Sequence, residues 1–442
     1  MKYVSITIIC LFTSVLVNAQ QQLTLQDAIA ATLKNNYDIL LSRNDSTSYA
    51  LDRYYSFAAF LPTVNGTGTI LWNTNNQQLK FASRSTGKDS LVTRNGVRTT
   101  NANYSVNLSW TLFDGMRMFA TRERLYELEQ LGGLAIKAQV VNSVAAVINN
   151  YYNIVRQKLQ LKAVEEQMSL NEERMKLADK KLSVGLGSKP ELLQAKVDYN
   201  AQKAAQINQL TLIAQLRDQL SQLIGFKTGS VYEVADTIPT NMGLQYGELA
   251  TKYEETNLDL MVAKKNIEIA NITVKEAKAG FWPTLSFNSA YNFTSTNNSV
   301  VVNQNQPFFN QNKGLNYGFG LNVPILNGFN TRRLIKQAKL DVQYQQINYE
   351  KQRTLVDVGL TNSFKNYEAQ KQLLTLEDDN IVLAEENVAI ARERWKQGVA
   401  TFIEYREAQF SLQDARNRLY AAQYNLKLAE TELLRLKGDL LK

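Results

Sequence analysis

Four short segments of this chain alternate apolar and polar residues and contain no charged side chain; they lie at 64–72, 101–113, 284–294 and 316–325. They come as two hairpins, and each hairpin is followed by a long stretch without proline. A period of two over about ten residues, with aromatic residues near the ends, is what a barrel strand with one face in lipid requires. A half-buried strand of a soluble protein usually keeps Lys, Glu or Asp on its wet face. The four segments therefore predict membrane-spanning β-strands.

The stretches 115–182 and 328–396 predict very long helices. Both lack proline and are rich in Leu, Ala, Gln, Glu, Lys and Arg, which favour helices. At 1.5 Å per residue, about 68 residues make a rod of roughly 100 Å, which must pack along its length against other helices. Apolar residues repeat at spacings of three, four and seven, as a coiled-coil seam does, at Leu161, Val164, Met168, Met175 and Leu182 and again at Phe410, Leu412, Leu419, Leu426 and Leu433.

The chain contains one unit written twice. AFLPTVN at 59–65 recurs as GFWPTLS at 280–286, and WTLFDG at 110–115 matches VPILNG at 323–328. The second match holds without a gap to the end of each copy, because Gly225 lies over Gly438. Internal repetition of this kind predicts two copies of one structural unit.

The expected fold class is an α+β membrane protein, with long antiparallel helical hairpins forming an α-barrel and four strands per chain contributing to a shared transmembrane β-barrel. A signal peptide is expected at 1–19, a first repeat at 20–225, an inter-repeat linker at 226–247 and a second repeat at 248–442. The elements expected in the first repeat are strands at about 62–73 and 101–113, a long helix at 115–182, a tip turn at 183–190 and a helix at 191–225. Those of the second are strands at about 284–294 and 316–326, a long helix at 328–396, a tip turn at 397–401 and a helix at 402–437.

The N-terminus has the features of a secretion signal. Lys2 supplies the positive end, residues 4–17 the apolar run, and Val17-Asn18-Ala19 a small-residue cleavage pattern. The only cysteine, Cys10, lies in this leader, so the mature chain is predicted to have no disulfide. Beyond residue 20 no run of eighteen apolar residues occurs, which predicts no membrane-spanning helix.

Composition argues against several classes of function. The chain has no histidine, which removes the most common general base and a common metal ligand. Paired cysteine motifs, glycine-rich phosphate loops and Ser/His/Asp arrangements are also missing from the sequence. We therefore expect no enzyme activity, no cofactor and no metal. Without Lys2, the mature chain has 48 basic and 41 acidic residues, and this excess of +7 is scattered rather than clustered, which does not indicate nucleic-acid binding.

One chain cannot close the predicted barrel. It has four strands, whereas the smallest membrane barrels have about eight. An open sheet edge in lipid leaves backbone groups unpaired at a cost of several kcal/mol each. The ring must therefore be shared between chains, and the residues alone allow two, three or four copies.

Two duplicated turns carry a resemblance to a known family. KLSVGLGSKPELLQAKVDYNAQ at 181–202 and RWKQGVATFIEYREAQFSLQDARNRLYAAQYNLKLAETELLRL at 394–436 each place a glycine turn before an acidic, Leu/Ala-rich helix. With the four strands, they make the chain resemble the TolC-like outer-membrane efflux channel family over nearly all its mature length. The resemblance implies a homotrimer in the outer membrane with a large periplasmic portion. It also implies a periplasmic adaptor protein and an inner-membrane transporter as partners.

The resemblance assigns a contact role to the tip turns. As backbone, each turn is expected to be a helix C-cap with a left-handed glycine, followed by a Ser or Thr N-cap. In the family these turns also meet the adaptor's helical hairpin. The residues expected to make that contact are Val184, Gly185, Leu186, Gly187 and Ser188 in the first turn and Gln397, Gly398, Val399, Ala400 and Thr401 in the second.

An acidic periplasmic gate is the second expected site. Glu404 and Glu407 share one helix face just past the second turn and match the two carboxylates that line the closed entrance in this family. Glu191 is the repeat mate of Glu404, and Trp395 occupies the position of an aromatic latch residue, placed to donate its indole N–H towards Glu191. Solvated surface carboxylates are the alternative for the two glutamates. Ala400 departs from the family, since some relatives have a basic latch residue there.

Three tryptophans are expected to anchor the barrel at the membrane interface, namely Trp72, Trp110 and Trp282, because they lie at the ends of predicted strands. The segments 73–100 and 295–315 are expected to be polar outer loops in contact with outer-membrane lipid, the first made basic by Lys80, Arg84, Lys88, Arg94 and Arg98.

The predicted function is a passive outer-membrane conduit of a tripartite efflux or secretion system, with energy supplied by the partner pump. The alternative is a periplasmic coiled-coil scaffold or adaptor without a pore. The sequence does not name the cargo: drugs, metals and proteins all remain open.

Overall fold

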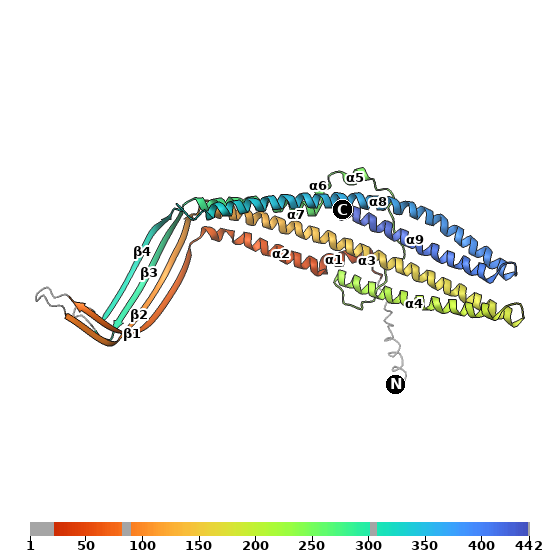
Figure 1. Cartoon of the computed structure of the whole chain (residues 1–442), viewed down its shortest axis with the longest axis horizontal. Helices are drawn as coiled ribbons and strands as arrows, with labels where there is room; N and C mark the ends of the chain where they lie inside the picture. The colour runs from red at the N-terminus through yellow and green to blue at the C-terminus, as the bar shows by residue number, and fades with distance from the viewer. Residues whose placement is uncertain (1–21, 82–89, 301–306, 441–442) are drawn as a thin grey trace, which may run out of the picture. The chain divides into compact units, whose positions relative to one another are not determined.

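The computed structural model describes residues 22–81, 90–300 and 307–440 (Figure 1). The chain divides into two compact units. One unit takes in the chain up to Thr47, Gly132–Lys264 and the chain from Asn348. The other takes in Ser48–Leu131 and Lys265–Ile347.

Helices make up most of the described chain. The two longest helices each have 67 residues, and each is followed by a helix of 36 residues. The α-helices are α1 (Leu25–Asn35), α2 (Tyr37–Tyr54), α3 (Arg117–Ser183), α4 (Lys189–Ile224), α5 (Tyr246–Ala250), α6 (Tyr253–Thr256), α7 (Leu258–Lys278), α8 (Asn330–Lys396) and α9 (Phe402–Lys437), and the 3-10 helices are η2 (Tyr55–Phe60) and η3 (Ala279–Phe281). Equal lengths in the two copies confirm the internal repeat.

The shorter helix of each repeat ends in the same way, and this helix end with its cap is called the joint below. Gly225 after α4 and Gly438 after α9 both adopt a left-handed conformation, with φ of 71° and 82°. An asparagine side chain then binds the exposed helix end: Asn36 Nδ2 donates to Leu223 O at 2.8 Å, and Asn257 Nδ2 donates to Leu436 O at 2.8 Å. These bonds satisfy carbonyls that a helix terminus otherwise leaves unpaired.

The described residues of the first unit form three buried apolar clusters. One lies between α1, α3 and α4 and contains Val144, Tyr151 and Leu220. The second joins α8, α9 and α5 around Tyr367 and Leu426. The third lies at the end of the hairpins and contains Ala195, Val388, Trp395, Tyr405 and Leu412.

The seam predicted on α3 is offset from the buried one. Val164 is buried, but Leu161, Met168, Met175 and Leu182 are only half-buried. The buried line instead runs through Gln167, Asn171, Arg174 and Ala178. Polar residues are tolerated there because they bond to one another and to α4: Gln167 Nε2 donates to Asn171 Oδ1 at 3.3 Å, and Asn171 Nδ2 to Asp198 O at 3.4 Å.

The second unit contains a four-stranded antiparallel sheet with strand order β1-β2-β3-β4 (Figure 1). The strands are β1 (Thr63–Phe81), β2 (Ser90–Phe113), β3 (Thr284–Asn298) and β4 (Phe309–Asn322). Within the described residues β1 and β4 are the edges of this sheet. Together with the helical hairpins, this sheet confirms the expected α+β class.

The strand pairing places apolar residues on one face of the sheet and polar residues on the other, as the alternation in the sequence predicted. The pairs Tyr104–Phe293 and Trp110–Phe287 lie opposite one another, and Phe287 lies opposite Phe319. Polar residues pair on the other face, where the hydroxyls of Thr67 and Ser105 are 2.7 Å apart and Ser109 Oγ donates to Asn288 Oδ1 at 3.1 Å. One face is therefore apolar and the other polar.

The strands are longer than the sequence predicted. Residues 73–81 and 90–100, expected in a loop, continue β1 and β2, with a register shift between Asn75 and Gln77. Similarly, β3 continues to Asn298 and β4 begins at Phe309. Backbone pairing extends through these polar residues because the ladder does not depend on apolar side chains. At its other end β4 stops at Asn322, two residues before Pro324, which cannot donate to a ladder.

One helix, α3, contains eighteen consecutive residues that are apolar enough by composition to cross a membrane, with a mean hydropathy of 1.6. Of that stretch, 39% is buried inside the fold. The sequence prediction counted uninterrupted apolar residues and did not single this stretch out. Packing within the fold explains part of the apolar character of α3, since this helix contributes Val144, Val147 and Ile148 to the first core cluster.

Candidate functional site

The tip turns close the helical hairpins with the same backbone geometry. In the first, Leu186 N donates to Lys181 O at 2.8 Å and Gly185, with φ of 78°, donates to Leu182 O at 3.1 Å. In the second, Val399 N donates to Arg394 O at 2.9 Å and Gly398, with φ of 76°, donates to Trp395 O at 3.1 Å. Both are Schellman caps, which require a residue that tolerates positive φ, so glycine is the residue expected at this point.

The helix starts after the two turns differ. Thr401 Oγ1 accepts a hydrogen bond from Glu404 N at 3.2 Å, which is the predicted N-cap. Ser188 has the extended backbone of an N-cap, but its hydroxyl makes no cap hydrogen bond, contrary to the prediction. Pro190 at the start of α4 lacks one of the N–H groups that a cap would serve.

Apolar side chains point outward at both tips. The exposed fraction is 68% for Val184, 81% for Leu186 and 66% for Val399, and Ile403 in the first turn of α9 is also exposed. Each tip therefore presents exposed apolar side chains.

The predicted gate carboxylates are on the outside of α9. Glu404 and Glu407 are exposed, whereas Tyr405 and Ala408, each the next residue along the chain, are buried. Glu404 also has a local role, because its Oε1 accepts a hydrogen bond from the Thr401 hydroxyl at 3.1 Å. Glu191 is half-buried in the first turn of α4.

Trp395 is part of a buried aromatic cluster rather than a lid over the first turn. Its ring stacks on Tyr405 with centroids 5.3 Å apart and meets Phe402 edge-on at 6.0 Å. Lys181 Nζ lies 4.6 Å from the indole centroid and donates to Trp395 O at 2.9 Å. The charged side chain of the first repeat that lies over the Trp395 ring is thus Lys181, a cation, where the sequence predicted an interaction with Glu191.

A buried ionic network lies beside this cluster, and the sequence analysis missed it. Asp198 on α4 accepts from Arg174 on α3, from Arg406 Nε on α9 at 2.9 Å and from Gln194 Nε2 at 2.9 Å. The Arg174 side chain is 1% exposed, that of Asp198 6%, and Arg174 also donates to the buried Gln409 Oε1 at 2.8 Å. The network therefore joins both repeats.

Burial and charge oppose each other in this network. Burial by itself would raise the pKa of the Asp198 carboxyl, but the hydrogen bonds from Arg406 and Gln194 and the charge of Arg174 outweigh it, so the pKa of Asp198 lies below its usual value. Burial lowers the pKa of Arg174, whereas Asp198 acts to raise it. Breaking a buried ion pair by removing one partner costs about 3–5 kcal/mol, because it leaves an uncompensated charge.

The predicted interface tryptophans occupy different positions on the sheet. Trp110 lies near the end of β2 and its Nε1 donates to Phe60 O at 2.9 Å. Trp282 lies two residues before the start of β3 and 60% of its surface is exposed. Trp72 lies in the middle of β1 rather than at a strand end, because β1 continues to Phe81. Of the five cations expected in the first loop, Lys80, Arg94 and Arg98 are in strands, while Arg84 and Lys88 lie outside the described residues.

Among the described residues, no group of three or more His, Cys, Asp or Glu side chains is arranged to hold a metal ion.

Comparison with known proteins places these features in a family. The outer membrane efflux protein family matches residues 29–226 and 249–439, once in each repeat. The chain is 20% identical to outer membrane protein TolC of Escherichia coli over 78% of its length and 71% of TolC, and 23% identical to the cation efflux system protein CusC of Escherichia coli over 93% of its length and 85% of CusC.

Solved structures show the same fold. The outer membrane protein VceC of Vibrio cholerae superposes with a TM-score of 0.74 at 15% identity, covering 94% of this chain and 96% of VceC. The Campylobacter jejuni CmeC outer membrane channel gives 0.73 at 18% identity, covering 94% and 86%. With the matched helical hairpins and four-stranded sheet, these results show that this chain is a member of the outer membrane efflux protein family.

Proposed function

We propose that three copies of this chain form a passive conduit that carries cargo from the periplasm through the outer membrane. The observation that carries the proposal is the open sheet: β1 and β4 are edges, and four strands are too few to close a membrane barrel. Pairing β4 of one copy with β1 of the next removes both edges, and three copies give a ring of twelve strands.

Exposed apolar residues on the helices support assembly. On α2, Leu41 and Leu51 are 63% and 54% exposed. On α8, Leu340, Tyr344 and Ile347 are 64–70% exposed. Exposed apolar side chains of this size on a helix indicate a missing packing partner. Burying them against a second copy stabilises the assembly by about 25 cal/mol per Å2 of apolar surface removed from water.

A ring of carboxylates at the periplasmic entrance follows from the same assembly. Glu404 and Glu407 are exposed on α9, so three copies supply six carboxylates around one axis, with Glu191 beside them. Such a ring attracts cations and repels anions at the mouth of a pore. Trp395 packs between the start of α9 and Lys181. This packing keeps in place the helix that carries the two glutamates.

The tip turns are the proposed contact for a periplasmic adaptor protein. Val184, Leu186 and Val399 offer exposed apolar side chains on turns whose glycines allow close approach of another backbone. The adaptor would link the channel to an inner-membrane transporter, which supplies the energy. In this proposal the chain itself performs no catalysis and needs no cofactor.

Conductance of the purified chain in a planar bilayer tests the gate. Replacing Glu404→Gln and Glu407→Gln together should raise conductance at low salt and weaken block by a multivalent cation by about tenfold or more, because a ring of like charges concentrates counterions by at least that factor. The matched control is Asp378→Asn with Asp379→Asn, two exposed acids on α8 that lie away from the tip.

The control should conduct as the wild type does. Equal block of the wild type and the Glu404/Glu407 variant would refute the gate, and absence of any conductance in the wild type would refute the conduit.

A further inference from the structure

The start of α8 carries a cluster of cations without acidic partners. Arg332, Arg333, Lys336 and Lys339 lie within its first ten residues, and the first acidic residue is Asp341. All four are exposed, and none makes an ion pair with a carboxylate of the described chain; Arg333 bonds only to the amides of Asn330 and Gln337. Cations at a helix N-terminus are unfavourable, since they oppose the helix dipole.

The repeat gives a direct comparison for these positions. With the offset of 213 residues, Arg332 lies over Phe119, Arg333 over Ala120 and Lys336 over Glu123. The first repeat thus builds the same strand-to-helix junction with no cation at any of the three positions. The start of α3 does carry Arg117, Arg122 and Arg124, but Glu123 and Glu127 lie among them, whereas α8 has no acid before Asp341. The unbalanced charge of the α8 cluster therefore points to a partner.

Exposed apolar residues lie between the sheet and this cluster. Ile325, Leu326 and Phe329 follow the end of β4 and are 94%, 79% and 63% exposed. Along the chain the order is therefore an apolar strand face, an exposed apolar connection and then a group of cations. This is the order in which a bilayer changes from acyl chains to phosphate headgroups.

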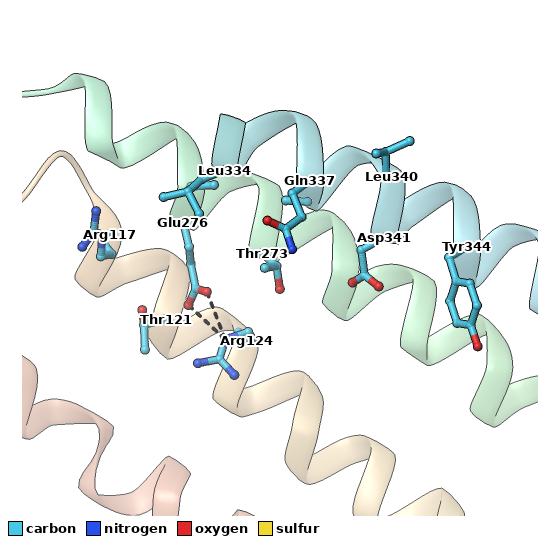
Figure 2. Close-up of a pocket in the computed structure, with 12 residues that line it drawn as sticks. Arg117, Thr121, Arg124, Thr273, Glu276, Leu334, Gln337, Leu340, Asp341 and Tyr344 are labelled. Atoms are coloured by element: carbon cyan, nitrogen blue, oxygen red, sulfur yellow. Dashed lines mark hydrogen bonds and ion pairs between the residues drawn. The ribbon is translucent and has the colours of Figure 1, made fainter. Parts of the chain in front are cut away.

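Three of the four cations line a pocket of about 530 Å3, whose lining residues are Phe329, Arg332, Arg333, Lys336, Gln337 and Leu340. Next to it is a larger groove of about 810 Å3 between α3, α7 and α8, which shares Gln337 and Leu340 (Figure 2). In that groove Arg124 is bound by Glu276 at 3.0 Å, and Asp341 and Tyr344 point towards α7 (Figure 2). The charged residues of the groove are two cations and two acids, whereas the charged residues of the smaller pocket are all cations.

We propose that Arg332, Arg333 and Lys336 bind the phosphate headgroup of an anionic phospholipid in the periplasmic leaflet of the outer membrane. Guanidinium groups suit phosphate because they donate paired hydrogen bonds, and the ammonium adds charge. The acyl chains would lie on Ile325, Leu326 and Phe329. The proposal rests on the sheet spanning the membrane, which is part of the proposed function.

Lipid selectivity of the full chain reconstituted in vesicles tests the site. Spin-labelled phosphatidylglycerol and phosphatidylcholine report how strongly each lipid is held at the protein surface. The wild type should hold phosphatidylglycerol at least about fivefold more strongly at low salt, the effect of one interfacial cation, and this preference should fall at high salt. Arg332→Gln with Arg333→Gln and Lys336→Gln should bring the two lipids close to parity.

The matched control removes three cations from the same helix farther along the chain, as Lys351→Gln with Lys365→Gln and Lys371→Gln. It should keep the preference. Equal retention of both lipids by the wild type, or an unchanged preference in the Arg332/Arg333/Lys336 variant, would overturn the site.

If the cluster instead meets a second copy of this chain, its removal would lower the heat stability of the trimer equally in both lipids and leave the preference unchanged. That outcome would also overturn the proposal. Conductance measured on the same vesicles separates the two ideas: a channel that conducts without lipid selectivity contradicts only this inference.

Discussion

The two repeats are built on the same backbone but differ in the side chains around their turns. Both have a 67-residue helix, a Schellman turn, a 36-residue helix and an asparagine at the final joint. At matched positions near the turn, however, the first repeat has Leu182, Gln194 and Leu193 where the second has Trp395, Glu407 and Arg406.

The two repeats share residues at positions where the backbone conformation admits few residue types. Gly225 and Gly438 combine positive φ with close contact to the next helix start, and no other residue type meets both conditions. The positions that differ carry the aromatic cluster, the ionic network and the acidic face. Differences between the repeats therefore mark where the chain does more than fold.

The largest effect is expected at Asp198, which has no counterpart in the second repeat, where the matched residue is the exposed Ser411. Asp198→Asn leaves Arg174 buried without a counter-charge and should lower the free energy of unfolding by about 3 kcal/mol, measured by denaturant titration in detergent. Ser411→Ala should change it by less than about 0.5 kcal/mol.

The pH dependence of this loss gives a second test. The pKa of Asp198 is depressed in the fold, so its contribution is present above the usual aspartate pKa of about 3.9 and is lost as the pH falls through the lower folded value. The difference between wild type and Asp198→Asn should therefore shrink below about pH 4. A difference that stays constant from pH 7 to pH 3 would contradict the charge assignment.

An intermediate effect is expected at the glycines that end the shorter helices. A Cβ added at Gly225 would lie 2.6 Å from Asn35 O, and one added at Gly438 would approach Thr256 O even more closely. Gly225→Ala and Gly438→Ala should each cost about 2 kcal/mol from backbone strain and this contact. The same change at Gly185 or Gly398, where nothing lies within 4 Å, should cost about 1 kcal/mol.

Equal losses of unfolding free energy in the Gly225→Ala and Gly438→Ala variants would show that the two helix ends contribute equally to stability. A loss at only one of them would break the symmetry that the repeat implies.

Much of this fold could be predicted from the sequence because its signals are periodic. Alternation in 101–113 gave the two faces of the sheet, and the absence of proline gave the long helices. Strand ends were harder to locate, because the paired residues beyond Trp72 are polar and resemble a loop. Backbone pairing continues there without an apolar pattern to reveal it.

The ionic network could not be predicted because it is a contact between distant helices. Arg174 lies four residues before the buried Ala178, and Asp198 lies three residues after the buried Ala195. Helical spacing of this kind was the one sign in the sequence that the two polar residues face the packed side of their helices. An apolar seam was assumed instead, and it lies one residue away from the buried line. The position of Trp395 was missed for the same reason, since its partner Lys181 is 214 residues away in the chain.

The smallest effect is expected at the two helix starts and sharpens the comparison between the turns. Thr401→Ala removes the cap that Thr401 Oγ1 gives to Glu404 N and should cost about 1 kcal/mol, so the amides at 402–406 should exchange with deuterium about fivefold faster. Ser188→Ala removes no cap bond and should leave the exchange at 189–193 unchanged. Because Glu404 belongs to the proposed gate, a looser first turn of α9 should also weaken cation block, without any change in charge. Faster exchange after Ser188→Ala, or none after Thr401→Ala, would mean that the two turns are not capped differently.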